Sequence, residues 1–324
     1  MKIVTVGTSQ ITGLLIQAFK RAGIEVFACI GRDFQRTRDF AEKHGIPYHA
    51  TDYEKALDSD AYDTVYLGIP NSLHHEYALR ALEKGKNVIV EKPFTSNMKE
   101  AKELIDIANA KDLLIFDANT TVHNRAYEQL KKDISLIGKI RMSELVYYQY
   151  SSKYDAFKEG KTSSNFDPEC SGGALMDLGI YNIEFAVGLY GLPASVTYQP
   201  NIQRGIDTDG VALLKYDGHI VTAINGKDAH GKSEIRIYGE KGNIIADGPS
   251  SHFDSYIIAL DNGTIINRTF DKGERYYHEV LDFLSISDYK NIRRNNEYLT
   301  LTLMSMKVLD DLRRSCGMVL KADA

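Results

Sequence analysis

Alternation between short apolar runs and helical patterns in the first third of the chain constrains its fold more than any other feature. Strand-like runs occupy residues 3–6, 26–30, 64–67, 88–90 and 113–116. Between them lie helical patterns, at about 11–21, 35–44, 73–83 and 99–110. Strands that alternate with helices of about 10–15 residues indicate βαβ units. Because these runs are apolar along their whole length, we expect both faces of a parallel sheet to be buried. The sequence therefore predicts a doubly wound α/β domain over residues 1–119.

The regular alternation of strand-like and helical patterns ends near residue 120. A helix-like segment at 127–134 leads into a strand at about 141–150. The polar stretch 151–171 follows, and its length is typical of a functional loop that covers a site. A helix over about 174–190 comes next.

The rest of the chain favours a large, mostly antiparallel sheet. Turn sequences such as Asp217-Gly218 separate its short apolar runs and are typical of hairpins. Two helices at 276–286 and 298–316 close the chain. We therefore predict a C-terminal α+β domain over 120–324, for substrate binding and oligomerisation, with strands at 195–199, 210–216, 219–225, 233–238, 242–247, 256–260 and 264–269.

Composition argues against several classes of function. The net charge of −5 leaves no broad basic field for nucleic acid. No stretch approaches the roughly 20 apolar residues of a membrane span. Three scattered cysteines, Cys29, Cys170 and Cys316, form no Cys-x-x-Cys pair, which disfavours a structural zinc site and a disulfide framework. We expect a soluble protein of the reducing cytoplasm, with no metal, nucleic-acid or membrane partner.

The turn after the first strand is a candidate dinucleotide site. It contains Gly7, Thr8 and Ser9, and the helix then opens with Gln10 and Ile11. In a Rossmann domain this turn aims helix N–H groups at a pyrophosphate. The usual G-x-G-x-x-G pattern is interrupted, because serine and threonine occupy the second and third glycine positions, as an ordinary βα turn would allow. Its place within a βαβ unit nevertheless favours these five residues as cofactor contacts.

The end of the second strand indicates which nucleotide binds. A carboxylate there would hold the ribose hydroxyls of NAD, but this chain has Gly31 and then Arg32. A small residue followed by a planar cation suits a 2′-phosphate, so Arg32 favours NADP(H), with NAD(H) also possible. Two plainer interpretations stay open: Arg32 as a solvated residue, and Asp33 as the N-cap of the next helix.

Four further segments carry a resemblance to a known family. Together with the first strand and turn they resemble the glucose–fructose oxidoreductase, inositol dehydrogenase and rhizopine-catabolism family, Gfo/Idh/MocA, over most of the chain. Glu-Lys-Pro alone is common, but its place after a strand combined with the later Gly-Gly-x-x-x-Asp-x-Gly-x-Tyr pattern is specific. The segments are Gly68–His74, Glu91–Pro93, Asn165–Pro168 and Gly172–Tyr181.

The chemistry of these residues also makes sense without the family. Asp177 and Tyr181 are spaced i, i+4 and face the same way on a helix. The glycines at 172–173 would let a ligand approach the backbone closely. Lys92 follows a parallel strand, where doubly wound folds bind ligands. A phenol has a pKa near ~10, which a neighbouring ammonium lowers, so a lysine and tyrosine could take an alcohol proton.

The resemblance implies Lys92, Asp177 and Tyr181 as the catalytic group. It also implies cofactor contacts beyond the first loop, from Ile69, Pro70, Asn71, His74, Glu91, Lys92 and Asn119. Each of these has a structural interpretation as well: a surface lysine, a helix-start carboxylate or histidine, a tyrosine that fills an interface. Tyrosine at 181 is similar to the aldose and dihydrodiol dehydrogenase branches. Arg125 stands where some relatives have proline in an Arg-Phe-x-Pro element, which leaves the specific substrate open.

The resemblance thus predicts an NAD(P)-dependent dehydrogenase or reductase acting on CH–OH groups. It would move a hydride between the nicotinamide and a carbinol carbon of a sugar, a polyol or a related vicinal diol. The family's antiparallel sheet commonly forms the subunit interface, which implies a homodimer or homotetramer. Two alternatives remain: a non-catalytic NAD(P)-binding sensor, and a reductase of C=N or C=C bonds.

Overall fold

A computed structural model describes residues 1–271 and 276–323, which form two compact units. The first contains residues 1–118 and 276–300, and the second contains residues 119–271 and 301–323. The last residue of the predicted C-terminal domain, 324, lies outside the described residues. The boundary at 119/120 stays a prediction about function. Periodicity did not indicate that a late segment of the chain would pack with the first unit.

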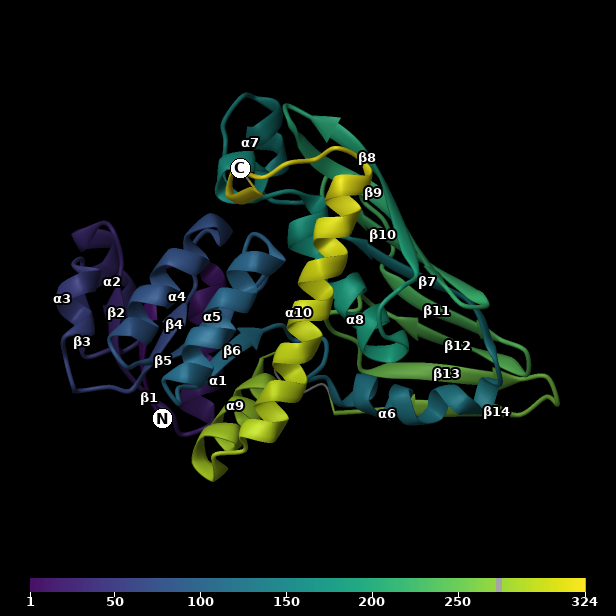
Figure 1. Ribbon diagram of the computed structural model, residues 1–324, viewed down its shortest axis with the longest axis horizontal. Coiled ribbons are helices and arrows are strands. Elements are labelled where there is room, and N and C mark those ends of the chain that lie inside the picture. The colour runs from purple at the N-terminus through teal and green to yellow at the C-terminus, as the bar shows by residue number, and fades with distance from the viewer. Residues whose placement is uncertain (272–275, 324) are drawn as a thin grey trace. The chain divides into compact units, whose positions relative to one another are not determined.

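Six parallel strands form the sheet of the first unit (Figure 1). Their order is β3-β2-β1-β4-β5-β6, and each neighbouring pair is parallel. The predicted doubly wound parallel sheet is therefore confirmed. Its strands are β1 (Lys2–Val6), β2 (Glu25–Ile30), β3 (Tyr48–Ala50), β4 (Thr64–Leu67), β5 (Asn87–Glu91) and β6 (Ile115–Ala118).

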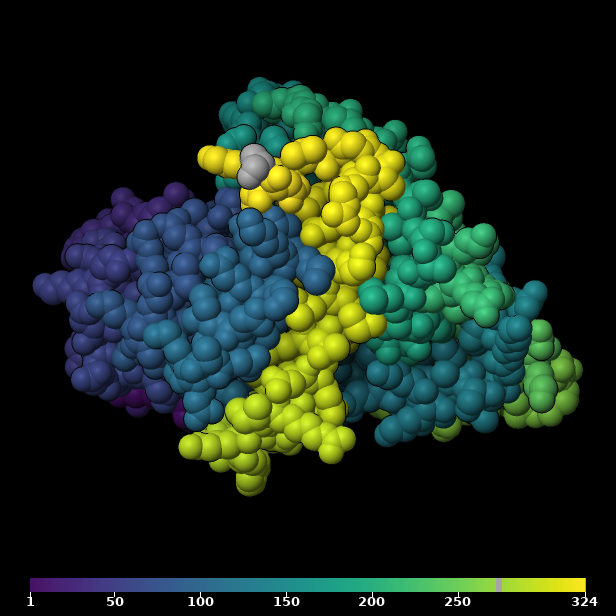
Figure 2. All heavy atoms as spheres, viewed as in Figure 1, coloured from purple at the N-terminus to yellow at the C-terminus, as the bar shows by residue number. Residues whose placement is uncertain are grey.

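Helices cover this sheet because each presents an apolar stripe. On α1, Leu15, Ile16 and Phe19 are almost fully buried, in one core with Val280 and Phe283 of α9. In the space-filling view, α4 and α5, in blue, cover the face turned to the viewer (Figure 2). The helices of this unit are α1 (Gln10–Arg21), α2 (Phe34–Lys43), α3 (Tyr53–Leu57), α4 (His74–Glu83), α5 (Met98–Ala110) and α9 (Tyr277–Tyr289). The sequence patterns missed β3 and α3, which are too short to show a period.

Eight strands form the sheet of the second unit. Their order is β14-β13-β12-β11-β7-β10-β9-β8, with β10 and β7 parallel and the other pairs antiparallel. This confirms the predicted large, mostly antiparallel sheet. Its strands are β7 (Ile140–Tyr148), β8 (Ser195–Gln203), β9 (Ile206–Tyr216), β10 (His219–Gly226), β11 (Glu234–Gly239), β12 (Gly242–Asp247), β13 (Ser255–Leu260) and β14 (Ile265–Thr269).

The predicted helix at 174–190 has an irregular beginning. Leu175–Gly179 is a turn of π-helix, and α8 (Ile180–Tyr190) continues from it. Asn182 fixes this helix to the sheet, because its amide donates to the carbonyls of Leu145 and Ile224. π-Turns inside helices are rare and occur frequently at functional sites.

The polar stretch 151–171 is ordered by a small core of its own. Tyr154, Phe157 and Phe166 are buried together with Ile206 of β9. The Arg204 guanidinium donates to the carbonyl oxygens of Phe157 and Gly160 at 2.6 and 3.2 Å. The stretch includes α7 (Tyr154–Lys158) and the 3₁₀ turns Ser164–Phe166 and Pro168–Cys170. The other helices are α6 (Arg125–Asp133) in the second unit and α10 (Ile292–Ser315), which begins in the first unit and ends in the second.

Candidate functional site

The turn between β1 and α1 requires glycine at its first position. Gly7 has φ +108°, a conformation that L side chains rarely adopt. A Cβ at this position would also lie 2.2 Å from the carbonyl oxygen of Gly68, in the loop after β4. The chain therefore passes close to the neighbouring loop at the carboxyl edge of the sheet, where doubly wound folds bind their ligands.

Serine and threonine replace the other two fingerprint glycines without disturbing the turn. Ser9 is the N-cap of α1, with an ordinary φ of −80°, and its hydroxyl accepts a hydrogen bond from the Thr12 amide at 3.0 Å. The helix α1 can still pack closely on the sheet, because the loop after β4 provides the space. A Cβ on Gly68 would lie 2.4 Å from the Thr12 hydroxyl, so this glycine leaves room for the threonine.

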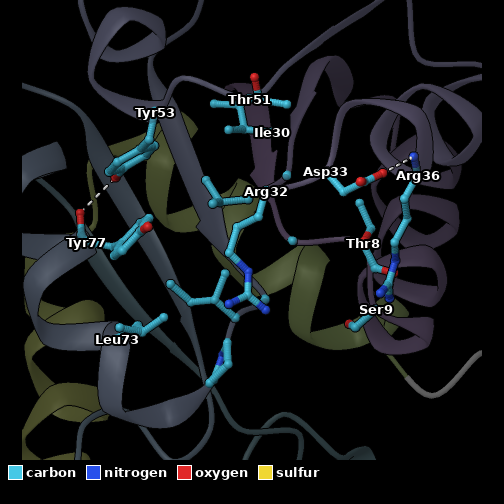
Figure 3. A pocket seen from close by; sticks show the side chains of 16 residues that line it. Thr8, Ser9, Ile30, Arg32, Asp33, Arg36, Thr51, Tyr53, Leu73 and Tyr77 are labelled. Carbon is cyan, nitrogen blue, oxygen red and sulfur yellow. Dashed lines mark hydrogen bonds between the residues drawn. The ribbon is translucent and has the colours of Figure 1, made fainter. Parts of the chain in front are cut away.

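A pocket of about 270 Å³ opens at this edge of the sheet (Figure 3). Six residues predicted to contact the cofactor line it. Other lining residues include Asp33, Arg36, Thr51, Tyr53 and Tyr77. The Tyr53 and Tyr77 rings stack at 4.7 Å, and the Tyr53 hydroxyl donates to the Tyr77 carbonyl at 2.7 Å. The six predicted residues are Gly7, Thr8, Ser9, Arg32, Ile69 and Pro70.

Two arginines give the pocket its positive charge. The side chain of Arg32 extends into the pocket (Figure 3). Arg36, one helical turn later, reaches the first loop, where its guanidinium donates to the Thr8 carbonyl at 3.4 Å. The carboxylate of Asp33 accepts from the Arg36 amide at 2.8 Å and is the N-cap of α2. The plainer interpretation of Asp33 is therefore confirmed, and the residues of this pocket fit a phosphorylated ribose.

His74 supports the loops and does not line this pocket. It is fully buried at the start of α4, with Nδ1 3.0 Å from the Pro93 carbonyl and Nε2 3.0 Å from the Ile69 carbonyl. Burial lowers the pKa of the ring, so near neutral pH it is uncharged and carries one N–H. The ring therefore donates to one of these two carbonyls and packs against the other, between the loop after β4 and the turn after β5. That turn contains Lys92.

Lys92 follows β5 and precedes a cis peptide bond to Pro93. Its neighbour Glu91 points inward and accepts a hydrogen bond from the Tyr66 hydroxyl at 2.8 Å. Burial, followed by the charge of Glu91, raises the pKa of Tyr66 well above its usual range, so the phenol stays protonated and donates. The backbone on both sides of Lys92 is thus held by buried contacts.

The other predicted cofactor residues lie outside the pocket lining. Gln10 and Ile11 are exposed on the first turn of α1, and Asn71 begins a 3₁₀ turn. Asn119, in the second unit, is 1% exposed and accepts from the Thr121 amide at 3.3 Å. Their cofactor roles stay predictions.

In the second unit, Asp177 lies in the π-turn and is held by two neighbours. Its Oδ2 accepts from the Lys227 ammonium at 2.8 Å and from the Asn165 amide at 3.2 Å. Lys227 directly follows β10 and is 2% exposed. Its role was not predicted, because nothing in a lysine at the end of a strand indicates a partner fifty residues earlier in the chain.

Tyr181, one turn after Asp177, is 5% exposed and lies at the start of α8. Its ring lies 5.7 Å from that of Tyr147 on β7. The next residue, Asn182, bonds to two strands, and this fixes the rotation of the helix that carries the phenol. Asp177 and Tyr181 thus belong to one rigid element, and Lys92 belongs to the other unit.

The glycine pair before the π-turn has a structural explanation that the sequence did not provide. Gly173 has φ +110°, and a Cβ there would lie 2.0 Å from the Asp207 carboxylate. Asp207 is fully buried and accepts from the Leu175 amide at 2.7 Å and from the Tyr198 hydroxyl at 2.8 Å. A Cβ on Gly172 would lie 2.6 Å from the Ser164 carbonyl. Protein atoms therefore occupy the space beside both glycines, where we expected a ligand to approach.

The described residues contain neither a candidate metal centre nor a candidate membrane span. No group of three or more His, Cys, Asp or Glu side chains there could hold a metal ion. Within the same residues, no helix has the length and apolar character needed to cross a membrane.

Similarity to known proteins extends over the whole chain. Residues 1–118 match the family described as "Oxidoreductase family, NAD-binding Rossmann fold", and residues 128–245 match the GFO/IDH/MocA C-terminal domain. The chain is 32% identical to scyllo-inositol 2-dehydrogenase (NADP(+)) IolU of Bacillus subtilis, over 100% of this chain and 99% of that protein. It is 28% identical to the uncharacterized oxidoreductase YgjR of Escherichia coli, over the same shares of the two chains.

A solved structure shares the fold. KijD10, a 3-ketoreductase from Actinomadura kijaniata crystallised with NADP and TDP-benzene, superimposes with a TM-score of 0.83. The match covers 97% of each chain at 20% sequence identity. At this identity the likeness is one of fold, and it includes both sheets.

Proposed function

Because the chain belongs to the Gfo/Idh/MocA family of NAD(P)-dependent oxidoreductases, we propose that it transfers hydride between NADP(H) and a carbinol carbon. The substrate is a sugar, an inositol or a related vicinal diol. The observation that carries this proposal is the similarity along the whole chain to an NADP(+)-dependent scyllo-inositol dehydrogenase.

The pocket of the first unit supports NADP(H) as the preferred nucleotide. The turn at Gly7 would place the backbone N–H of Ser9 and the start of α1 beside the pyrophosphate. Arg32 and Arg36 would hold the 2′-phosphate, since guanidinium groups bind phosphate oxygens in a planar, charge-assisted geometry. Among the described residues that line the pocket, the one acidic residue is Asp33, and it is engaged as a helix cap. When bound, the nicotinamide supplies or accepts the hydride.

We assign the hydroxyl proton of the substrate to Lys92 and Tyr181, with Asp177 as the carboxylate that orients the group. A lysine ammonium near the phenol would favour the phenolate and allow it to accept that proton. In reduction the same phenol returns the proton to the oxygen. The first unit would bind the cofactor, and the π-turn and stretch 151–171 of the second would bind the polyol.

A calorimetric titration with NADPH and NADH, followed by a turnover screen, tests this function. The screen contains scyllo-inositol, myo-inositol, aldoses and diols with NADP⁺, and an imine and an enone with NADPH. We expect tighter binding of NADPH and turnover of a polyol. Lys92→Ala and Tyr181→Phe should abolish turnover. Tyr181→Phe should also leave the binding of NADPH within about threefold, because Tyr181 does not line the pocket described above.

Each alternative function has its own outcome in that screen. Binding without turnover on any substrate identifies a sensor, and turnover confined to the imine or enone identifies a C=N or C=C reductase. Failure to bind either nucleotide contradicts the assignment of the Gly7 loop.

We also propose that the protein is a cytoplasmic homodimer or homotetramer. Three free cysteines are compatible with a reducing compartment. The outer face of the eight-stranded sheet exposes Ile220, Ile245 and Ile257 by 39–48%, and such a face favours association. Sedimentation equilibrium measures the oligomeric state, and a monomer at micromolar concentration would contradict this part of the proposal.

A further inference from the structure

Among the described residues of the second unit, the least exposed lysine is Lys227. Its side chain is directed at the carboxylate of Asp177. Lys227 is 2% exposed, and its ammonium lies 2.8 Å from Asp177 Oδ2 and 2.8 Å from the Asn165 carbonyl. The ammonium also lies over the Phe166 ring, 4.4 Å from its centroid. A buried ammonium is costly unless it is paired, and Asp177 is the carboxylate that contacts this lysine directly, while Asp207 also lies within reach of its charge.

The pairing also constrains the carboxylate. Lys227 and the Asn165 amide both donate to the same oxygen, Oδ2. The donors come from the end of β10 and from the 3₁₀ turn Ser164–Phe166, and the acceptor lies on the π-turn. Three separate segments therefore fix the rotation of the Asp177 side chain.

The backbone of Lys227 is anchored as firmly as its side chain. Its amide donates to the Thr208 carbonyl at 2.8 Å, and its carbonyl accepts from the Ser151 amide at 2.8 Å. Ser151 begins the polar stretch 151–171, and Asn165 and Phe166 lie within it. The Phe166 ring beneath the ammonium is part of the small core that orders this stretch.

We propose that Lys227 and Asn165 are positioning residues for Asp177, and that they couple the conformation of 151–171 to the catalytic carboxylate. The proposal rests on the function assigned to Asp177 above. Neither residue is a proton donor or acceptor in the reaction. Lys227 keeps Asp177 charged and oriented, and Asn165 transmits the position of the stretch, since its side chain binds Asp177 and its backbone binds Lys227.

Substitution of Lys227 tests the first part. In the full-length protein, Lys227→Met should lower kcat for the best polyol of the screen by on the order of 10²-fold, as loss of a group that orients a reacting residue does. The affinity for NADPH should not change. Lys86→Met is the matched control, because Lys86 is also buried and held by two carbonyls and a tyrosine ring, but in the first unit. Its kcat should stay at the wild-type value.

A double-mutant cycle separates positioning from general support of the fold. In an Asp177→Asn background, Lys227→Met should change the residual kcat by less than about threefold, because the charge it orients is already gone. The same loss of kcat in both backgrounds would overturn the proposal. Asn165→Ala is the second variant, since Asn165 is exposed and its loss should not prevent folding. It should lower kcat about threefold to tenfold, as the loss of one hydrogen bond from an exposed side chain does, and an unchanged kcat would contradict its role.

A readout without turnover keeps this inference separate from the assigned function. The carboxyl carbon of Asp177 can be followed by ¹³C NMR in protein labelled at aspartate, with Asp177→Asn for assignment. Its pKa should be higher in Lys227→Met than in the wild type, because the cation is lost. Asp207, which approaches the same turn from β9, is present in both proteins. An equal Asp177 pKa in the two proteins overturns the positioning role. A pKa that is raised in Lys227→Met, together with a wild type that turns over no substrate, contradicts only the proposed function.

Discussion

Replacement of Arg32 by alanine should reduce the preference of the protein for NADPH over NADH, and Arg36 should retain the rest of that preference. Arg32 follows β2, lines the pocket and extends into it (Figure 3). NADH lacks the 2′-phosphate, so its affinity should not depend on this guanidinium. The variant therefore acts on the difference between two ligands, which is less sensitive to general damage than either affinity alone.

The expected magnitude follows from the exposure of the site. A hydrogen bond to a charged group contributes about 1.5–3 kcal/mol. Because Arg32 is exposed, the lower end applies, and about 1.4 kcal/mol corresponds to a tenfold change in Kd. We expect Arg32→Ala to weaken NADPH about tenfold and NADH less than twofold. Arg36 is the second cation of the pocket, so Arg32→Ala/Arg36→Ala should weaken NADPH by roughly 10²-fold if the two act independently.

Isothermal titration calorimetry suits this measurement, because the chain contains no tryptophan for a fluorescence signal. Arg38→Ala is the matched control: Arg38 lies on α2, the helix that carries Arg36, is exposed, and pairs with Glu42 at 3.4 Å outside the pocket. The preference of Arg32→Ala for NADPH should also depend less on salt than that of the wild type. Equal weakening of both nucleotides would refute the reasoning, and so would an NADPH affinity that does not change.

Three further variants test the packing around the site. Gly173→Ala should lower the free energy of unfolding by about 2–4 kcal/mol, measured in urea, because φ is +110° and the new methyl group would overlap Asp207. His74→Phe should cost about 1–3 kcal/mol in the same assay, since it removes a buried hydrogen bond to a carbonyl. Burial alone would raise the pKa of the Asp133 carboxyl, but hydrogen bonds, above all from Arg268, lower it below its usual value. The carboxylate therefore stabilises the fold at pH values above its unfolded pKa of about 3.8. Asp133→Asn should therefore cost about 1–2 kcal/mol at pH 7, and the difference from wild type should disappear as the pH falls through the lowered folded pKa.

The parallel sheet could be predicted from the sequence because its signal is local. Apolar runs such as 64–67 and 88–90 are buried on both faces, and a helix of full length separates them. The direction of the strands then places Lys92 at the carboxyl edge of the sheet without knowledge of any contact. Elements shorter than one period, such as β3 and α3, carry no such signal and were missed.

The surroundings of Asp177 could not be predicted because they depend on contacts distant in sequence. Its spacing from Tyr181 predicted a regular helix, whereas the helix begins with a π-turn. The buried Asp207, from a strand thirty residues later, caps this turn through the Leu175 amide and occupies the space that glycine leaves at 173. Neither the register of that strand nor the position of Lys227 has a local signature. The sequence thus predicts the candidate site residues, whereas only the tertiary packing shows which contacts hold them in place.

The interrupted glycine fingerprint shows how a local rule can fail while its physical basis holds. The third glycine of the pattern normally allows a helix to pack closely on a strand. Here Thr12 occupies that place, and the missing space is provided by Gly68 after β4, where a Cβ would lie 2.4 Å from the threonine hydroxyl. The same hydroxyl lies 2.9 Å from that of Ser9, the residue that replaces the second glycine and caps the helix. The threonine is thus accommodated by a glycine at a position that the pattern does not include. It follows that Gly68→Ala should damage this loop more than Ser9→Gly, although only position 9 belongs to the fingerprint.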